Sequence, residues 1–303
     1  MLTVFTPTYN RAHTLPRLFD SLQAQDCKDF EWLVVDDGST DGTAGLFQDW
    51  IKAEMDFPIR YYRTENGGKQ RAVNKGVSLA EGRYFFIVDS DDSLLPDAVS
   101  FVLEAFSILP NDPSFIGVSG LKGDAQGIPL GGGPDLGGKL WVDASNLERP
   151  RYGLSRDMAE VFFTDKLRNY PFPVWGGEKF TPEAVVWDQM ALDGYKLRWF
   201  DKVIYRCEYL PGGLTDSSWR LLKENPMGYA MLYNVRLRSC HRLKSRLQNA
   251  IAFDAYCILA REWPYFKKSC SPKLTLFLSP LGFLLACRRK RQFFRFLPAD
   301  GSE

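Results

Sequence analysis

The stretch Tyr84-Phe85-Phe86-Ile87-Val88-Asp89-Ser90-Asp91-Asp92 is an apolar run that ends in three carboxylates among four residues. An aromatic and β-branched run of this length predicts a strand buried on both faces of a parallel sheet. Open α/β sheets bind ligands at the carboxyl ends of such strands. Carboxylates crowded there repel one another unless a cation joins them, and their hard oxygens suit Mg²⁺ or Mn²⁺ bridging to a substrate phosphate. The stretch therefore predicts a metal and a phosphorylated ligand.

Strands and helices alternate along the first third of the chain. Right-handed β-α-β units of this kind build a mostly parallel central sheet flanked by helices, so we expect an α/β fold. The expected strands are 2–6, 30–35, 59–62 and 84–88, and the expected helices are 14–24, 43–53 and 69–80.

The rest of the chain combines a glycine-rich stretch with further helices and strands. The glycine-rich stretch 115–150 suits a mobile loop or a small subsheet over the site. Helices are expected at 96–109, 156–167, 182–192, 228–239 and 243–262, and a last pair of strands within 197–206.

The composition indicates a well-cored globular protein without a strong charge. The chain has 303 residues, of which 45% are hydrophobic and 14% aromatic. Its 38 basic and 37 acidic side chains give a net charge of +1, so we expect no nucleic-acid partner. Six cysteines without a C-x-x-C pair and two separate histidines lack zinc-ligand spacing. Met1 is followed at once by a strand, which leaves no room for a signal peptide, and we expect a cytoplasmic protein.

Three polar motifs follow three of the expected strands. They are Pro7-Thr8-Tyr9-Asn10, Asp36-Asp37-Gly38-Ser39-Thr40-Asp41 and Asp89-Ser90-Asp91-Asp92, and Asn74, Gly76, Ala80 and Gly82 accompany them. In this order the motifs resemble the family-2 glycosyltransferases of GT-A fold, over roughly the first two thirds of the chain. The resemblance implies sugar transfer with inversion at the anomeric carbon, from a nucleotide-sugar donor, with Mn²⁺ or Mg²⁺. A UDP-sugar donor and a glycan or lipid-linked acceptor in cell-envelope polysaccharide synthesis are the expected substrates.

The resemblance also implies a division of the chain. We expect a GT-A catalytic domain over residues 1–215, with a nucleotide-binding half 1–110 and an acceptor half 111–215. Residues 216–303 are expected to form a helical extension.

Site residues follow from the same motifs. Asp91 is the expected direct metal ligand, with Asp89 turned to metal or ribose and Asp92 in support. The expected donor-binding residues are Pro7, Thr8, Tyr9, Asp36, Asp37, Lys69, Arg71, Asp89 and Ser90. A carboxylate can accept the imide N–H of uracil, which makes Asp36 the base-reading candidate, and Tyr9 offers a flat packing face. A structural role stays open for three of the segments that contain these residues. Residues 37–41 could form a turn and helix cap, residues 67–71 a solvated cationic helix end, and residues 89–92 a helix cap.

An inverting transfer needs a general base for the attacking hydroxyl. In the family this base is often the aspartate of a Glu-Asp pair at a helix start, and Pro182-Glu183 occupies that place here. Glu183 is therefore the expected base, with Glu178 and Asp188 in reserve. Acidic residues in a first helical turn also complement the helix dipole, which is the structural alternative for Glu183.

The tail combines apolar, basic and aromatic residues. Residues 274–287 form an apolar stretch that is too short to span a bilayer, because a span needs about 20 residues. Arg288-Arg289-Lys290-Arg291 and several aromatic residues follow, and such a mixture suits anionic headgroups. We expect residues 274–297 to lie at the cytoplasmic membrane surface, which would make the protein peripheral on its inner face. The alternative is a C-terminal helix docked on the catalytic domain.

Two other functions stay open. Sugar nucleotidyltransferases of a related α/β core usually carry a glycine-rich loop after the first strand, where this chain has Pro7-Thr8-Tyr9-Asn10. A non-catalytic binder of nucleotide sugars or glycans is compatible with Pro182 in place of the glutamate. A dehydrogenase is disfavoured, because no G-x-G-x-x-G follows the first strand.

Overall fold

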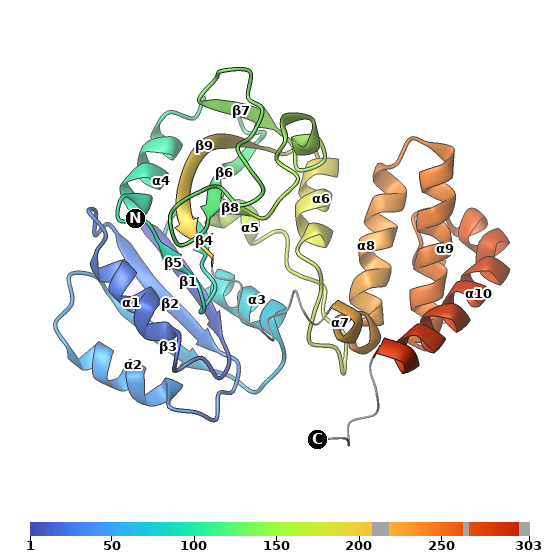
Figure 1. Ribbon diagram of the computed structural model, residues 1–303, viewed down its shortest axis with the longest axis horizontal. Helices are drawn as coiled ribbons and strands as arrows, with labels where there is room; N and C mark the ends of the chain where they lie inside the picture. The colour runs from blue at the N-terminus through green and yellow to red at the C-terminus, as the bar shows by residue number, and fades with distance from the viewer. Residues whose placement is uncertain (208–217, 263–266, 297–303) are drawn as a thin grey trace. The chain divides into compact units, whose positions relative to one another are not determined.

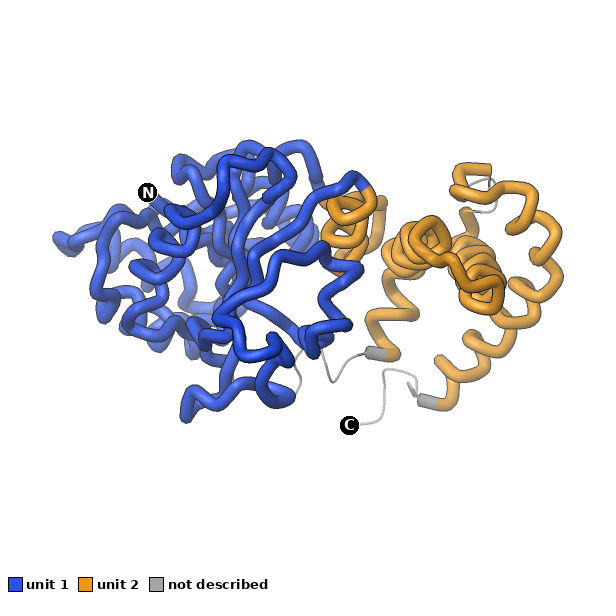
Figure 2. Tube along the Cα trace, turned by 90° about the horizontal axis from the view of Figure 1, so that it is seen from above, with its two compact units in different colours: residues 1–171, 193–208 blue, residues 172–192, 209–303 orange. Residues whose placement is uncertain are grey.

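The computed structural model describes residues 1–207, 218–262 and 267–296. The chain forms two compact units, which Figure 2 distinguishes by colour. Unit 1 comprises residues 1–171 and 193–208, and unit 2 comprises residues 172–192 and 209–303. The division expected at residue 215 stays a prediction, and the structure itself groups 172–192 with the C-terminal helices.

The first half of unit 1 is a parallel sheet with helical crossovers, as expected from the alternating pattern. β1 pairs in parallel with both β2 and β4, and β2 pairs in parallel with β3. Every residue of β1 and β2 is buried, which is the pattern of strands covered on both faces. The elements are β1 (Leu2–Thr8), α1 (Leu15–Gln23), β2 (Phe30–Asp36), α2 (Thr43–Lys52), β3 (Ile59–Arg63), α3 (Lys69–Leu79) and β4 (Tyr84–Ile87).

The second half of unit 1 extends the same sheet with mixed strand directions (Figure 1). The strand order is β3-β2-β1-β4-β8-β6-β9-β5, and β7 pairs with β9. β8 is antiparallel to both of its neighbours, β4 and β6. The elements are β5 (Ser93–Leu94), α4 (Ala98–Ser107), β6 (Phe115–Gly123), β7 (Trp141–Ala144), the 3₁₀ turn η1 (Arg149–Tyr152), β8 (Met158–Phe163), α5 (Thr164–Leu167) and β9 (Lys196–Arg206).

Three sequence-based expectations are wrong in this half. The pair of strands expected within 197–206 is the single strand β9. The helix expected at 156–167 is β8 followed by one short helix, because the exposed edge of β4 takes these residues as its partner strand. The stretch 115–150 is not only a loop or subsheet, since it contains β6, a long strand inside the main sheet. Gly117 allows β6 to approach β8 closely: a Cβ at this position would lie 2.0 Å from the Val161 carbonyl oxygen.

Unit 2 is helical. α9 packs against α8 on one side and α10 on the other, and Phe253, Tyr256 and Cys257 of α9 form a small core with Met227 and Ala230 of α8. The helices are α6 (Ala184–Leu192), α7 (Ser218–Glu224), α8 (Pro226–Ser239), α9 (Leu243–Leu259) and α10 (Pro272–Phe296). No helix in the described ranges is both long and apolar enough to cross a bilayer.

Candidate active site

The three sequence motifs meet at one edge of the sheet in unit 1. Thr8 at the end of β1 is the register partner of Asp36 at the end of β2. β4 lies on the other side of β1, and its carboxyl end leads into Asp89. Because parallel strands place their carboxyl ends together, the loops after β1, β2 and β4 share this edge, where α/β sheets bind ligands.

Asp36 is fully buried, and both of its carboxylate oxygens have partners. The Ser39 backbone N–H donates to Oδ1 at 2.8 Å, and the Tyr61 hydroxyl donates to Oδ2. Burial, together with the Asp36 carboxylate, raises the pKa of Tyr61, so its hydroxyl stays protonated and keeps donating. The orientation of the Asp36 carboxylate is therefore fixed from two sides, and its role in base reading stays a prediction.

Asp37 holds the glycine loop at the start of α3. Its two oxygens accept the backbone N–H groups of Gly67 and Gly68, each at 2.7 Å. The Arg71 guanidinium donates to the Gly67 carbonyl oxygen from inside the helix. The amides of this loop are thus bonded to Asp37, and both Asp37 and Arg71 hold the loop by hydrogen bonds.

Tyr9 is an accessible aromatic side chain of the β1 loop, with 47% of its surface exposed. The loop is tied to the β2 loop by Asn10, which has φ of 52°: its N–H donates to Ser39 Oγ, and its Oδ1 accepts the Thr40 N–H, both at 2.8 Å. Thr8 is buried, and its hydroxyl has no hydrogen-bond partner within the described ranges. The β1 loop thus exposes the ring of Tyr9 next to a residue, Asn10, that is hydrogen-bonded to the β2 loop.

The carboxylates after β4 lie beside cations. Asp89 Oδ1 is 2.6 Å from Lys69 Nζ, and Asp91 Oδ2 is 3.4 Å from Arg11 Nη2. Both carboxylates are partly exposed, whereas Ser90 and Asp92 are buried. The accessible members of the motif are therefore Asp89 and Asp91, each with a positive charge at hand.

Tyr205 of β9 fixes the turn that carries these carboxylates. The Asp89 N–H donates to the Tyr205 oxygen at 2.9 Å, and the Tyr205 hydroxyl donates to Asp92 Oδ2 at 2.8 Å. Lys122 of β6 lies over the Tyr205 ring, 4.4 Å from its centre. Sequence reasoning missed Tyr205, Lys122 and Arg11. The supporting metal role expected for Asp92 stays a prediction, and in this structure its carboxylate is buried and accepts the Tyr205 hydroxyl.

The pKa values of Asp89 and Asp92 are shifted in opposite directions. Burial acts against ionisation at Asp89, but Lys69, followed by Lys122, outweighs it and lowers the pKa of this carboxyl. Burial, followed by the charge of Asp89, raises the pKa of Asp92 to about 6. Asp89 is thus ionised at neutral pH and ready to bind a cation, while Asp92 is the member that most easily holds a proton.

A divalent cation is compatible with Asp89 and Asp91. Within the described residues, no three His, Cys, Asp or Glu side chains gather closely enough to hold a metal alone. Mg²⁺-type sites, however, commonly use one or two carboxylates and complete their shell with water and substrate phosphates. The two accessible carboxylates fit a site of this second kind.

The expected base residues lie in unit 2. Glu183 precedes α6, and its carbonyl oxygen accepts the N–H groups of Val186 and Trp187. Asp188 is buried within α6. Glu178 caps another helix, because its oxygens accept the first N–H groups of α8 at 2.7 and 2.9 Å. Glu178 thus has a structural role, and the catalytic roles of Glu183 and Asp188 stay predictions.

Comparison with known proteins agrees with this geometry. Residues 3–118 match the family model "Glycosyl transferase family 2". Over 130 residues the chain is 34% identical to the putative teichuronic acid biosynthesis glycosyltransferase TuaG of Bacillus subtilis, a match to 43% of this chain and 50% of that protein. Over 105 residues it is 36% identical to the GalNAc(5)-diNAcBac-PP-undecaprenol β-1,3-glucosyltransferase of Campylobacter jejuni, covering 34% of this chain and 33% of the relative.

Two solved structures share the fold along most of the chain. S. aureus TarS 1–349 in complex with UDP-GlcNAc has a TM-score of 0.58 at 18% identity, covering 96% of this chain and 91% of that one. The mannosyltransferase PcManGT from Pyrobaculum calidifontis, in complex with GDP-Man and Mn²⁺, has a TM-score of 0.57 at 18% identity, covering 96% and 87%.

The matched region defines the class of protein. Residues 3–118 carry a family-2 glycosyltransferase domain, in agreement with the family expected from the motifs. The solved structures share the expected fold. The curated relatives named above are matched over half of their length or less.

Proposed function

We propose that this chain is an inverting glycosyltransferase that takes a sugar from a UDP-sugar and gives it to a glycan or lipid-linked acceptor in cell-envelope polysaccharide synthesis. The observation that carries the proposal is the meeting of three motifs at one sheet edge, where Asp89 and Asp91 lie beside Lys69 and Arg11. Support comes from the undecaprenol-linked substrate in the name of the C. jejuni relative and from the UDP-GlcNAc in the TarS complex. We place the reaction at the cytoplasmic face of the membrane.

The proposed donor site uses the residues at this edge in distinct roles. Tyr9 packs on the nucleoside, and Asp36 reads the base from an orientation fixed by Ser39 and Tyr61. Asp91, with Asp89, holds Mn²⁺ or Mg²⁺, which when bound supplies a positive charge that stabilises the departing diphosphate. PcManGT, whose structure holds GDP-Man and Mn²⁺, supports this assignment.

Lys69 and Arg11 have a second role in this proposal. Each lies beside one of the carboxylates Asp89 and Asp91, and its positive charge lowers the repulsion between them. A cation held by the two carboxylates would take the place of these basic side chains. Lys69 and Arg11 could then pair with phosphate oxygens of the donor and stabilise the charge that develops on the leaving group.

The base is proposed to be Glu183. Glu183→Gln keeps the size of the side chain but cannot take a proton, so turnover should fall by roughly 10² to 10⁴ while donor affinity is unchanged. Asp188→Asn is the matched comparison, because Asp188 lies on α6, the helix that Glu183 precedes, and is buried. If Asp188→Asn costs more turnover with donor binding retained, the role of base moves to Asp188.

The donor is identified by ligand-induced stabilisation. A panel of UDP- and GDP-sugars with Mn²⁺ is added before heating, and the true donor at about 100 times its dissociation constant stabilises the chain by about 2.7 kcal/mol. Release of nucleoside diphosphate from the same donor then separates an enzyme from a binder, because a binder leaves the donor intact. Stabilisation without turnover, with and without acceptor glycans, would contradict the proposed activity.

A further inference from the structure

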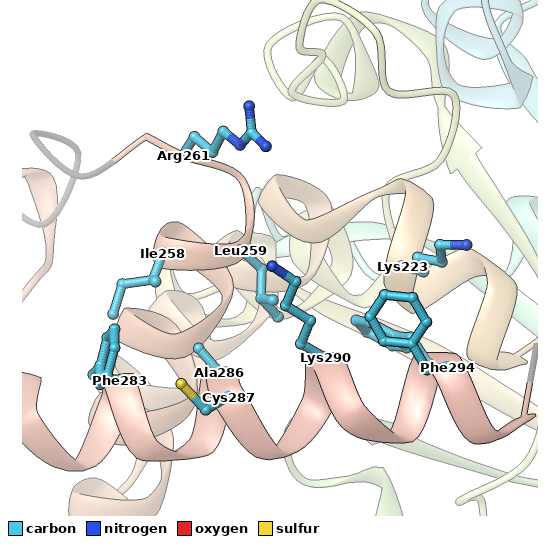
Figure 3. A pocket seen from close by; sticks show the side chains of 10 residues that line it. Lys223, Ile258, Leu259, Arg261, Phe283, Ala286, Cys287, Lys290 and Phe294 are labelled. Carbon is cyan, nitrogen blue, oxygen red and sulfur yellow. The ribbon is translucent and has the colours of Figure 1, made fainter.

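Unit 2 contains a cavity of about 460 Å³ between the end of α9, the C-terminal half of α10 and α7 (Figure 3). Its walls are mainly apolar: Ile258 and Leu259 of α9, and Phe283, Ala286, Phe293 and Phe294 of α10. This volume lies within the range of small-molecule sites, which are mostly apolar with a few polar groups. The cavity is therefore large enough for part of an apolar chain.

Three cations stand at the rim of this cavity: Lys223 of α7, Lys290 of α10 and Arg261 after α9. All three side chains are exposed, and within the described ranges none forms an ion pair with a carboxylate. Like charges around an apolar opening repel one another, so an anion placed between them is favourable. The rim thus complements a negatively charged head group.

Arg261 occupies a backbone position that favours glycine. Its φ is 58°, and its N–H donates to the Ile258 oxygen while the Glu262 N–H donates to the Cys257 oxygen. These two bonds define a Schellman turn in which the left-handed residue is usually glycine. Arg261 therefore has a backbone conformation that arginine disfavours, and residues in such conformations are common at ligand sites.

The outer face of α10 continues the apolar surface of the cavity. Phe277, Leu281 and Leu284 are each about half exposed or more, whereas Leu278 and Ala286 are buried against the other helices. Arg288 and Arg291 on the same helix are exposed as well. α10 is therefore docked through one face and presents a second apolar face flanked by positive charge.

We propose that this cavity binds an anionic lipid, with its apolar chain between Phe283 and Phe293 and its phosphate head between Arg261, Lys290 and Lys223. The lipid is either a free isoprenyl or acyl phosphate or a phospholipid of a membrane against which the outer face of α10 rests. This site is separate from glycosyl transfer and does not depend on the proposed donor, metal or base.

The test uses the full chain and calorimetric titration with farnesyl phosphate as the probe. Farnesol lacks the charge and inorganic phosphate lacks the chain, so each should bind at least about tenfold more weakly, a difference of about 1.4 kcal/mol. Lys290→Ala should weaken farnesyl phosphate binding by about tenfold. Arg291→Ala is the matched control, because it removes the same charge from an exposed position of α10 that does not line the cavity.

Arg261→Gly separates binding from folding. Glycine suits the left-handed position, so this variant should melt at a higher temperature and yet bind farnesyl phosphate several-fold more weakly. Equal affinity for farnesol and farnesyl phosphate, equal losses in Lys290→Ala and Arg291→Ala, or unchanged affinity in Arg261→Gly would each overturn the proposal.

Vesicles identify the source of the lipid. Binding to phosphatidylcholine vesicles only when they contain phosphatidylglycerol, with competition by farnesyl phosphate, assigns the site to a membrane phospholipid. Binding of farnesyl phosphate without any vesicle binding assigns it to a free lipid phosphate. No binding of either probe contradicts the site.

Discussion

Asp254 is a carboxylate buried in α9, and replacing it by asparagine is expected to stabilise the helical unit at alkaline pH. Its side chain is 1% exposed, and neither carboxylate oxygen has a hydrogen-bond partner in the described parts of the chain. Gly282 of α10 packs directly on it, since a Cβ at Gly282 would lie 2.6 Å from the Asp254 Cβ. Burial of the charge without a partner raises the pKa of Asp254 to about 7.

The magnitude follows from the gap between this pKa and the ordinary value of 3.8. At 1.36 kcal/mol per pH unit, the gap corresponds to roughly 4 kcal/mol of folding free energy as an upper value. Below pH 3.8 Asp254 is protonated in both the folded and the unfolded chain, so its ionisation does not affect the folding free energy. As the pH rises to about 7, only the unfolded chain loses the proton, so stability is progressively lost, and the full loss is present above that pH.

Asn keeps the shape of the protonated side chain and does not titrate. Asp254→Asn should therefore match the wild type at about pH 4 and exceed its stability by up to roughly 4 kcal/mol at about pH 8. The assay is hydrogen exchange of the α9 and α10 amides, which reports the opening free energy of this unit alone. Glu224→Gln, an exposed change on α7, is the control and should alter stability by less than about 0.5 kcal/mol at either pH. A variant advantage that is the same at both pH values would refute the reasoning.

Three further changes test the packing around the sheet and helices. Gly117→Ala should cost about 2 to 4 kcal/mol in urea unfolding, because its Cβ would meet the Val161 carbonyl oxygen at 2.0 Å, whereas Gly133→Ala, which meets nothing within 4 Å, should cost less than about 1 kcal/mol. Asp37→Asn should speed exchange of the two loop amides before α3 by tenfold or more, since it loses a charged acceptor worth about 1.5 to 3 kcal/mol; unchanged exchange would argue against this clamp. Glu178→Ala should reduce stability by about 1 to 2 kcal/mol, because two N–H groups of α8 lose their cap, and a neutral result in urea unfolding would count against that role.

The parallel half of the fold could be predicted because its signals are local. β1, β2 and β4 are largely apolar, and the helices α1, α2 and α3 alternate with the strands from β1 to β4. The antiparallel half depends on pairing between distant segments, which periodicity does not encode. β8 lacks a clear alternation, and it becomes a strand because β4 and β6 offer edges on both sides.

The candidate site divides in the same way. Asp36, Asp89 and Asp91 could be found because each follows a strand within a recognisable motif. Tyr205 could not, because it lies 113 residues from Asp92 and only the sheet brings its hydroxyl to that carboxylate. The buried state of Asp92 was missed for the same reason, since a carboxylate in a motif gives no sign of which neighbours will cover it.

Metal-dependent release of nucleoside diphosphate from the donor tests the central claim most directly. Turnover by the wild type should rise with added Mn²⁺ or Mg²⁺ and disappear with a chelator. Asp91→Asn keeps the shape of the side chain but removes the charge that holds the cation, so turnover should fall by at least about 10² at every metal concentration, with unfolding by urea unchanged. Activity of Asp91→Asn equal to that of the wild type across the metal titration would contradict the assignment of this sheet edge as a metal-assisted glycosyltransferase site.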